Sequence, residues 1–279
     1  LVAFAQESIS RGSKSFRFAS RLFDRTTRER VWLLYAWCRK CDDMADGQDH
    51  GGAMEAVTDP QARLQAIRQL TAMALAGAPT SEPAFDCLGV VARECGITSR
   101  MAEDVIEGFA LDAADWRPRR ESDLYQYCYH VAGAVGVMMA VVMGVPADDD
   151  ATLDRACDLG LAFQLANIAR DIAEDDAAGR CYLPDDWLAM LDIAPGEHMK
   201  PHNRKKLALI GRWLADEAEQ YEASARVGAK HLPLRARWAV LSAAGIYGEI
   251  ARKVRAAQAH AWDQRIFTSR PEKFRWVRK

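Results

Sequence analysis

The chain has 279 residues, 49% of them hydrophobic and 27% charged, a composition that supports a folded core and excludes a largely disordered chain. Its formal net charge of −2 lacks the basic excess of nucleic-acid-binding proteins, so we expect no nucleic acid partner. Seven cysteines, an odd number, do not suggest a disulfide framework and fit a reducing cytoplasm. Because the first residue is Leu1 rather than Met, we expect trimmed termini.

Apolar residues recur at helical spacing along almost the whole chain, and no segment shows the sustained alternation of a strand. Thr26 and Glu29 have the spacing of a capping box and predict a helix that runs to about Gly47. No Gly/Ser-rich linker divides the sequence. We therefore expect one all-α domain over residues 1–279, a bundle of roughly eight to ten helices around a central cavity.

Two acidic clusters stand out in this helical sequence. On a helix of about 3.6 residues per turn, Asp42 and Asp46 project from one face. Asp171 and Asp175 have the same spacing, and Asn167 lies one turn before them. Each pair of carboxylates suits a hard divalent cation such as Mg²⁺, which completes its coordination with water and substrate phosphate oxygens.

The alternative is that both pairs are solvated helix faces, since like charges four residues apart cost only about 0.2–0.5 kcal/mol. The residues before each pair favour a lined cavity instead. Tyr35 and Arg39 precede the first pair on its own stripe, Gln164 precedes the second, and the neighbouring positions are apolar rather than Lys or Glu. We therefore prefer a metal and phosphate site.

Other patterns predict less. Cys38 and Cys41 have C-x-x-C spacing without a second pair, so we favour a structural role over zinc or redox chemistry. The uncharged run 131–147 is 17 residues long, shorter than the roughly 20 apolar residues of a membrane span, and predicts a buried helix. Its small residues leave room either for a neighbouring helix or for one wall of a tunnel. Both interpretations stay open.

The C-terminal segment, residues 265–279, is rich in Arg and Lys and contains Phe267, Phe274 and Trp276. Such a segment can lie on an anionic membrane surface, and a solvated tail is an equally good interpretation. We expect a cytoplasmic protein, attached peripherally to the inner face of the cell membrane if the first interpretation holds.

Four stretches, taken together and in this order, resemble the squalene/phytoene synthase family, most of all its bacterial phytoene synthases. They are Ser13-Lys14-Ser15-Phe16, residues 35–43, residues 127–133 and residues 164–171. The resemblance covers essentially the whole chain. It implies an isoprenoid-synthase-type helical bundle that joins two geranylgeranyl diphosphates head to head. The path runs through a cyclopropylcarbinyl diphosphate to phytoene and releases two diphosphates.

The resemblance also implies roles for residues of this chain. It implies metal ligands at Asp42, Asp46, Asn167, Asp171 and Asp175. It implies catalytic roles for these four aspartates and for Arg39, Arg170 and Tyr127, the last near the reacting carbons. It implies substrate contacts at Ser13, Ser15, Phe16, Tyr35, Gln164, Asn167, Tyr182, Tyr247 and Arg265. The expected cofactor is Mg²⁺, with Mn²⁺ as a substitute, and no nicotinamide cofactor is expected.

Several alternatives stay open. A squalene or dehydrosqualene type of synthase would use farnesyl diphosphate, and a head-to-tail elongase would share the metal chemistry. A non-catalytic helical lipid-binding protein would not need both pairs of aspartates. A di-iron oxidase is set aside because no Glu is followed three residues later by His. The sequence does not identify the base that removes the final proton, and the released diphosphate is as good a candidate as a side chain.

Overall fold

The computed structural model describes residues 1–12, 14–47 and 59–278, without the side chains of Lys14 and Ser15. Within these ranges the chain forms thirteen α-helices and no strand, which confirms the all-α prediction. The helices are α1 (Val2–Gly12), α2 (Lys14–Ser20), α3 (Arg25–Ala45), α4 (Pro60–Leu75), α5 (Pro83–Cys95), α6 (Ser99–Ala113), α7 (Glu121–Cys128), α8 (Ala134–Val142), α9 (Asp150–Ala177), α10 (Asp185–Met190), α11 (Arg204–Gly228), α12 (Leu234–Ala257) and α13 (Arg270–Arg278). The number exceeds our expectation because short helices such as α2, α10 and α13 lie between the long ones.

The start of α3 differs from the sequence prediction. Asp24 is the N-cap, and its side chain accepts a hydrogen bond from the backbone N–H of Thr27 at 3.0 Å. The capping box predicted from Thr26 and Glu29 was therefore wrong, because Asp24 stands in position to satisfy the free N–H groups two residues earlier. Glu29 instead forms an ion pair with Arg25 at 2.8 Å.

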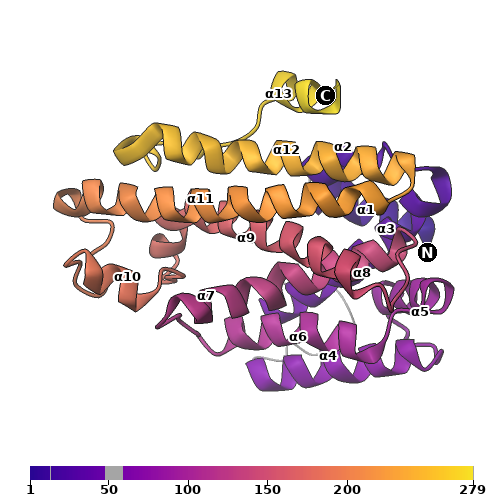
Figure 1. Cartoon of the computed structure of the whole chain (residues 1–279). Coiled ribbons are helices and arrows are strands. Elements are labelled where there is room, and N and C mark those ends of the chain that lie inside the picture. The colour runs from indigo at the N-terminus through magenta and orange to yellow at the C-terminus, as the bar shows by residue number, and fades with distance from the viewer. Residues whose placement is uncertain (13, 48–58, 279) are drawn as a thin grey trace.

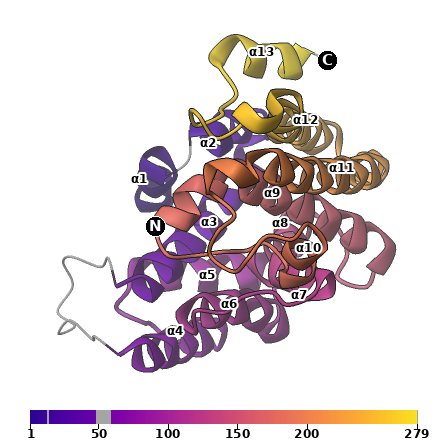
Figure 2. The same cartoon turned by 90° about the vertical axis from the view of Figure 1, so that its left-hand side faces the viewer.

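Helix α9 is the long inner helix of the bundle. Figures 1 and 2 show α11 beside it, with α12 and then α13 further out. The opposite side of α9 meets both α8 and the π-helix that precedes it, Tyr129–Gly133, at a very short separation. A Cβ on Gly160 would lie 2.2 Å from the carbonyl oxygen of Ala132 in the π-helix, and a Cβ on Gly136 of α8 would lie 2.4 Å from that of Ala156. Glycine is required at both positions because these backbones touch directly.

The uncharged run 131–147 is not one continuous helix. Its first residues belong to a π-helix, Tyr129–Gly133, and its middle forms α8. Its small residues have both kinds of neighbour: Gly136 receives the backbone of α9, and Ala132, Gly136 and Ala140 line a cavity. That this cavity is a tunnel for a long apolar ligand stays a prediction. A π-helix inside a helical run is often found at a functional site.

The buried residues form two clusters. The first is centred on α3, α5, α6 and α8, and the second on α9, α11 and α12. Helices of both clusters line the cavity described below, so the apolar core continues into the cavity wall. Among the described residues, none of the helices combines the length and the apolar character that crossing a membrane requires.

Candidate active site

The first carboxylate pair, Asp42 and Asp46, lies where α3 ends, and Asp46 is the C-cap residue. Arg39, one turn earlier, donates to Asp42 at 3.0 Å and forms an ion pair with Asp43 at 2.7 Å. Burial, followed by the negative charge of Asp46, raises the pKa of Asp42 to about 6, although Arg39 opposes the shift. The pair therefore carries negative charge that the neighbouring arginine does not fully neutralise.

The second carboxylate pair, Asp171 and Asp175, lies in the last third of α9. Arg170 donates two hydrogen bonds to the carboxylate of Asp171, from Nε to Oδ1 at 2.6 Å and from Nη2 to Oδ2. Arg265, from the segment after α12, approaches the same carboxylate at 3.3 Å, so it does reach this site. Burial and then the charge of Asp171 raise the pKa of Asp175 to about 6. In each pair, one carboxylate therefore has a raised pKa, because burial and the negative charge of the other aspartate oppose its ionisation.

The two pairs meet around Arg180, which follows α9. The pKa of Arg180 is raised first by Tyr182 and then by the carboxylates of Asp112 and Asp46. The same guanidinium opposes the upward shift of Asp175. Because one cation interacts with members of both pairs, α3 and α9 present their carboxylates to a common space.

The donor atoms suit a hard cation, and their number matters. In the part of the chain that is described, no three His, Cys, Asp or Glu side chains are close enough together to hold a metal ion. Each pair therefore supplies two carboxylates rather than a closed cage. Mg²⁺ is typically held in this way, by one or two carboxylates with water and substrate phosphates completing its octahedron. The residues present fit such an ion.

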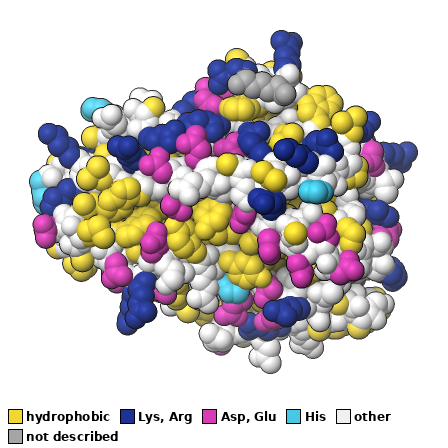
Figure 3. Space-filling model, in the orientation of Figure 1, with side chains coloured by type: hydrophobic (Ala, Val, Ile, Leu, Met, Phe, Trp, Pro, Cys, Tyr) yellow, Lys and Arg dark blue, Asp and Glu magenta, His cyan; other side chains and the backbone are white. Residues whose placement is uncertain are grey.

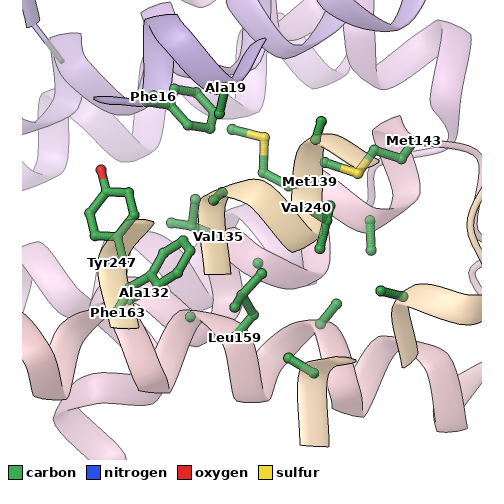
Figure 4. A pocket seen from close by; sticks show the side chains of 18 of the residues that line it. Phe16, Ala19, Ala132, Val135, Met139, Met143, Leu159, Phe163, Val240 and Tyr247 are labelled. Atoms are coloured by element: carbon green, nitrogen blue, oxygen red, sulfur yellow. The ribbon is translucent and has the colours of Figure 1, made fainter. Parts of the chain in front are cut away.

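A larger cavity of about 350 Å³ is lined by residues of α2, α3, α8, α9, α11 and α12 (Figure 4). It reaches Cys38, one turn before Asp42, and Asn167, one turn before Asp171. Its wall is almost entirely apolar. Phe16, Tyr35, Gln164, Asn167 and Tyr247, all predicted to contact substrate, are among its lining residues. Figure 4 shows Tyr247 and Phe163 side by side, and their rings stack with centroids 4.2 Å apart. Phe16 and Tyr35 form a second stacked pair at 5.6 Å.

A smaller cavity of about 250 Å³ lies beside the first. It contains Arg39 and Asp42 at one end and Asp112 of α6 in its wall. The two cavities share four lining residues: Tyr35, Cys38, Val131 and Val135. A molecule held by the first carboxylate pair therefore has access to both spaces.

Tyr127 and Tyr182 contact Asp112, which lines the smaller cavity, but they do not line either cavity themselves. Their rings stack at 4.8 Å, and Trp116 stacks on the outer face of Tyr127 at 5.3 Å. Both hydroxyls donate to Oδ1 of Asp112, at 2.9 Å from Tyr127 and 3.1 Å from Tyr182. The two predicted tyrosines are thus joined through a carboxylate that the sequence reasoning missed.

Sequence reasoning missed Asp112 and Arg180. For Asp112 a signal was present in the sequence, because it continues the apolar stripe of Val105, Gly108 and Phe109 at offsets of seven, four and three residues. A carboxylate on an apolar stripe calls for an explanation. Arg180 carries no such signal, since it follows the end of α9 and its neighbours come from other helices.

Ser13 lies outside the described residues, and so does the side chain of Ser15, so their predicted contacts stay predictions. Burial raises the pKa of Cys38 to about 12 and that of Cys41 well above its ordinary value, so both remain protonated thiols, as a structural role requires.

The chain matches the family model described as Squalene/phytoene synthase over residues 9–272. It is 49% identical to a phytoene synthase of Pseudescherichia vulneris and 48% identical to a 15-cis-phytoene synthase of Pantoea ananas. Each alignment covers 98% of this chain and 88% of the relative.

The solved structures agree with these matches. A dehydrosqualene synthase in complex with a ligand superposes with a TM-score of 0.87 at 28% identity, covering 99% of this chain and 94% of that one. A squalene synthase from Alicyclobacillus acidocaldarius shares the fold, with a TM-score of 0.78 at 22% identity over 92% of this chain and 94% of that one. The fold is the all-α isoprenoid synthase fold, and this chain belongs to the squalene/phytoene synthase family.

Proposed function

We propose that this chain is a phytoene synthase, which joins two geranylgeranyl diphosphates head to head and releases two diphosphates. Membership of the family makes it a prenyltransferase that acts on prenyl diphosphates. The relatives that are 48–49% identical over nearly the whole chain are named phytoene synthases. The observation that carries the choice of a C20 substrate is the length of the larger cavity along α9.

The cavity lining on α9 extends from Asn167, beside the carboxylates, to Thr152 at the far end. At about 1.5 Å per residue, these fifteen helix steps span ~22 Å. An extended chain advances ~1.2 Å per bond, so a C20 prenyl group with about 16 carbons in line reaches ~19 Å and a C15 group ~14 Å. The C20 group fills this length, whereas the C15 group would leave a void against an apolar wall.

We propose Mg²⁺ as the cofactor, with Mn²⁺ as a substitute, held by the four aspartates of the two carboxylate pairs and by the amide oxygen of Asn167. The excess negative charge that raises the pKa of Asp42 and Asp175 supports cation binding at both pairs. When bound, the metal would supply positive charge that stabilises the departing diphosphate. Conversion to phytoene is redox-neutral, so no nicotinamide cofactor is needed.

Three arginines are placed to receive the diphosphate. Arg39, Arg170 and Arg265 each pair with an aspartate in the absence of substrate. Their planar guanidinium groups suit phosphate oxygens, and stabilising the charge that develops on a leaving group is typically the largest contribution to such catalysis. We propose that they exchange part of their contact with aspartate for contact with phosphate when the substrate binds.

The cavity wall would protect the carbocation that remains. Its residues are apolar apart from a few polar groups near its two ends, so water is excluded from most of its length. The stacked rings of Phe163 and Tyr247, and those of Phe16 and Tyr35, present π faces near the carboxylate end. Each face can stabilise a desolvated cation by up to about 2 kcal/mol.

We also propose peripheral attachment to the inner face of the cell membrane through the C-terminal segment. Phe267 and Phe274 are 68% and 54% exposed, and the basic residues of α13 lie beside them. Trp276 does not belong to this surface, because Arg226 and Arg252 cover its ring at 5.7 and 5.0 Å. Figure 3 shows basic and acidic side chains interspersed on the face that includes α11 and α12, so this face offers no uniformly basic surface to an anionic lipid.

Flotation with anionic liposomes tests the attachment. The double variant Phe267→Ala and Phe274→Ala should float less than the parent protein, while Met190→Ala, which removes an exposed apolar residue on α10, should float equally well. Equal flotation of parent and double variant would contradict the proposal.

The enzymatic function is tested by incubating the purified protein with farnesyl and geranylgeranyl diphosphate, with and without Mg²⁺ and NADPH. We expect phytoene from the C20 substrate, dependent on Mg²⁺ and indifferent to NADPH. Efficient dehydrosqualene formation from the C15 substrate would favour the alternative that the dehydrosqualene synthase neighbour suggests. Absence of diphosphate release from both substrates would refute both.

A further inference from the structure

Among the described residues, two carboxylates line the smaller cavity, Asp42 and Asp112. Asp112 belongs to neither carboxylate pair. It lies on the last turn of α6, and the cavity also contains Arg39 and Asp42. Its Oδ1 accepts both tyrosine hydroxyls, from Tyr127 and Tyr182. Within the described part of the chain, its Oδ2 accepts no hydrogen bond.

Groups on two neighbouring parts of the fold hold this carboxylate in place: Tyr127 reaches it from α7, and Tyr182 and Arg180 from the segment after α9. The first carboxylate pair, at the end of α3, carries the same charge and repels it. Burial raises the pKa of Asp112, while the hydrogen bonds from the two tyrosines and the charge of Arg180 oppose this shift. The ring stack from Trp116 through Tyr127 to Tyr182 keeps both hydroxyl donors aligned. One oxygen is therefore fixed, and the other is left for a molecule in the cavity.

The chemistry of head-to-head coupling requires a base at this place. The carbons that are joined are those that carried the diphosphates, and each coupling step ends when a proton leaves such a carbon. The base must therefore lie next to the carboxylate pairs, on the side where the prenyl chain enters. Asp112 satisfies both conditions, because it shares the smaller cavity with Asp42 and faces its apolar wall. A buried carboxylate is a common general base in enzymes.

We propose that Asp112 is the catalytic proton acceptor of the coupling reaction, an inference that rests on the function proposed above. Its Oδ2 takes the proton from the carbon that carried the diphosphate. In the first coupling step the electron pair of the broken C–H bond closes the cyclopropane ring, and in the last step it forms the central double bond. Each time the carboxylate becomes a carboxylic acid, which gives its proton to water or released diphosphate before the next step. Tyr127 and Tyr182 act as positioning residues, since their hydroxyls hold Oδ1 and so aim Oδ2.

The variant Asp112→Asn tests this role because its side-chain oxygen still accepts hydrogen bonds from the tyrosines but cannot take up a proton. Loss of a general base lowers the rate of proton transfer by typically about 10²–10⁴-fold. We expect phytoene formation to fall at least ~100-fold per diphosphate released, with prenyl alcohols from water capture in its place. Diphosphate release itself should stay close to the parent rate, because ionisation depends on other groups.

Asp104→Asn is the matched control. Asp104 lies on the same helix and accepts a hydrogen bond from Tyr129 at 2.9 Å, but it lines neither cavity. It should keep the parent ratio of phytoene to diphosphate. If Asp112→Asn does not fold, Asp112→Ala with added formate replaces it, and formate should restore phytoene formation where chloride does not.

Three results would overturn the inference. They are an unchanged ratio of phytoene to diphosphate in Asp112→Asn, an equal loss of both products, or no rescue of Asp112→Ala by formate. Failure of the proposed function would be visible separately, because the parent protein would then make no phytoene from geranylgeranyl diphosphate.

Discussion

The length of the larger cavity predicts the effect of closing it at a chosen depth. Ala156 lines the cavity on α9, eleven residues from Asn167, which corresponds to about 16 Å of helix. Phenylalanine at this position would move the floor from ~22 to ~16 Å. The C15 chain of ~14 Å would still fit, whereas the C20 chain of ~19 Å would not.

The magnitude follows from the carbons that lose their place. The terminal isoprene unit of the C20 substrate has five carbons, and each buried CH₂ contributes about 0.8 kcal/mol. Its exclusion would therefore cost about 4 kcal/mol, close to a thousandfold in kcat/KM for geranylgeranyl diphosphate. The value of kcat/KM for farnesyl diphosphate should change less than about tenfold.

The assay compares kcat/KM for both substrates in the parent, in Ala156→Phe and in Ala151→Phe. Ala151 is exposed on the first turn of the same helix and does not line the cavity. Its variant therefore controls for the effect of a phenylalanine on the helix itself. Overpacking at residue 156 can lower stability by about 1–3 kcal/mol, which thermal unfolding would reveal. Unchanged use of the C20 substrate, or an equal loss with both substrates in a folded variant, would refute the assignment of the far end of the cavity.

Four further predictions concern the carboxylates and the contact of α9 with the π-helix Tyr129–Gly133. Asp42→Asn and Asp171→Asn should each lower diphosphate release by about 10²–10³-fold with the thermal unfolding temperature retained, and a smaller loss would argue against both as ligands. Since the pKa values of Asp42 and Asp175 are raised to about 6, catalysis should fall as pH drops below 6, where both protonate and release a cation. Because the folded protein holds these protons more tightly than the unfolded chain, the stability of the metal-free protein should decrease as pH rises from about 4 to 6. Its denaturation midpoint should therefore be higher at pH 5 than at pH 7, and Asp175→Asn should reduce this difference. Gly160→Ala should destabilise the protein by at least about 1–3 kcal/mol in urea unfolding, because the new Cβ would lie 2.2 Å from the carbonyl oxygen of Ala132, and an unchanged midpoint would contradict this contact.

The sequence predicted those features that depend on position along one helix. The two carboxylate pairs are set by four-residue spacing, and Arg39 lies on the stripe of the first pair, where it contacts Asp42. Arg170 is not on the stripe of the second pair but directly precedes Asp171, with which it forms an ion pair. The all-α fold follows from helical periodicity along the chain. The helix boundary at Asp24 was missed because two capping signals compete within a few residues, and the local sequence does not rank them.

Features that depend on the approach of separate helices were not predictable in this way. The contact of Tyr127 and Tyr182 with Asp112 joins three segments that are up to 70 residues apart in the chain. The direct contact of α9 with the π-helix at Gly160 likewise decides where the cavity runs, since it closes one side of it. Spacing within one helix carries no information about either distance.

The products of one reaction show whether this protein is a phytoene synthase. The purified protein is supplied with geranylgeranyl diphosphate and Mg²⁺ without any reductant, and phytoene and diphosphate are quantified over the same time course. We expect phytoene to form and two diphosphates to appear for each molecule of it. Diphosphate release without any C40 hydrocarbon, or a hydrocarbon that forms only when NADPH is present, would contradict this expectation.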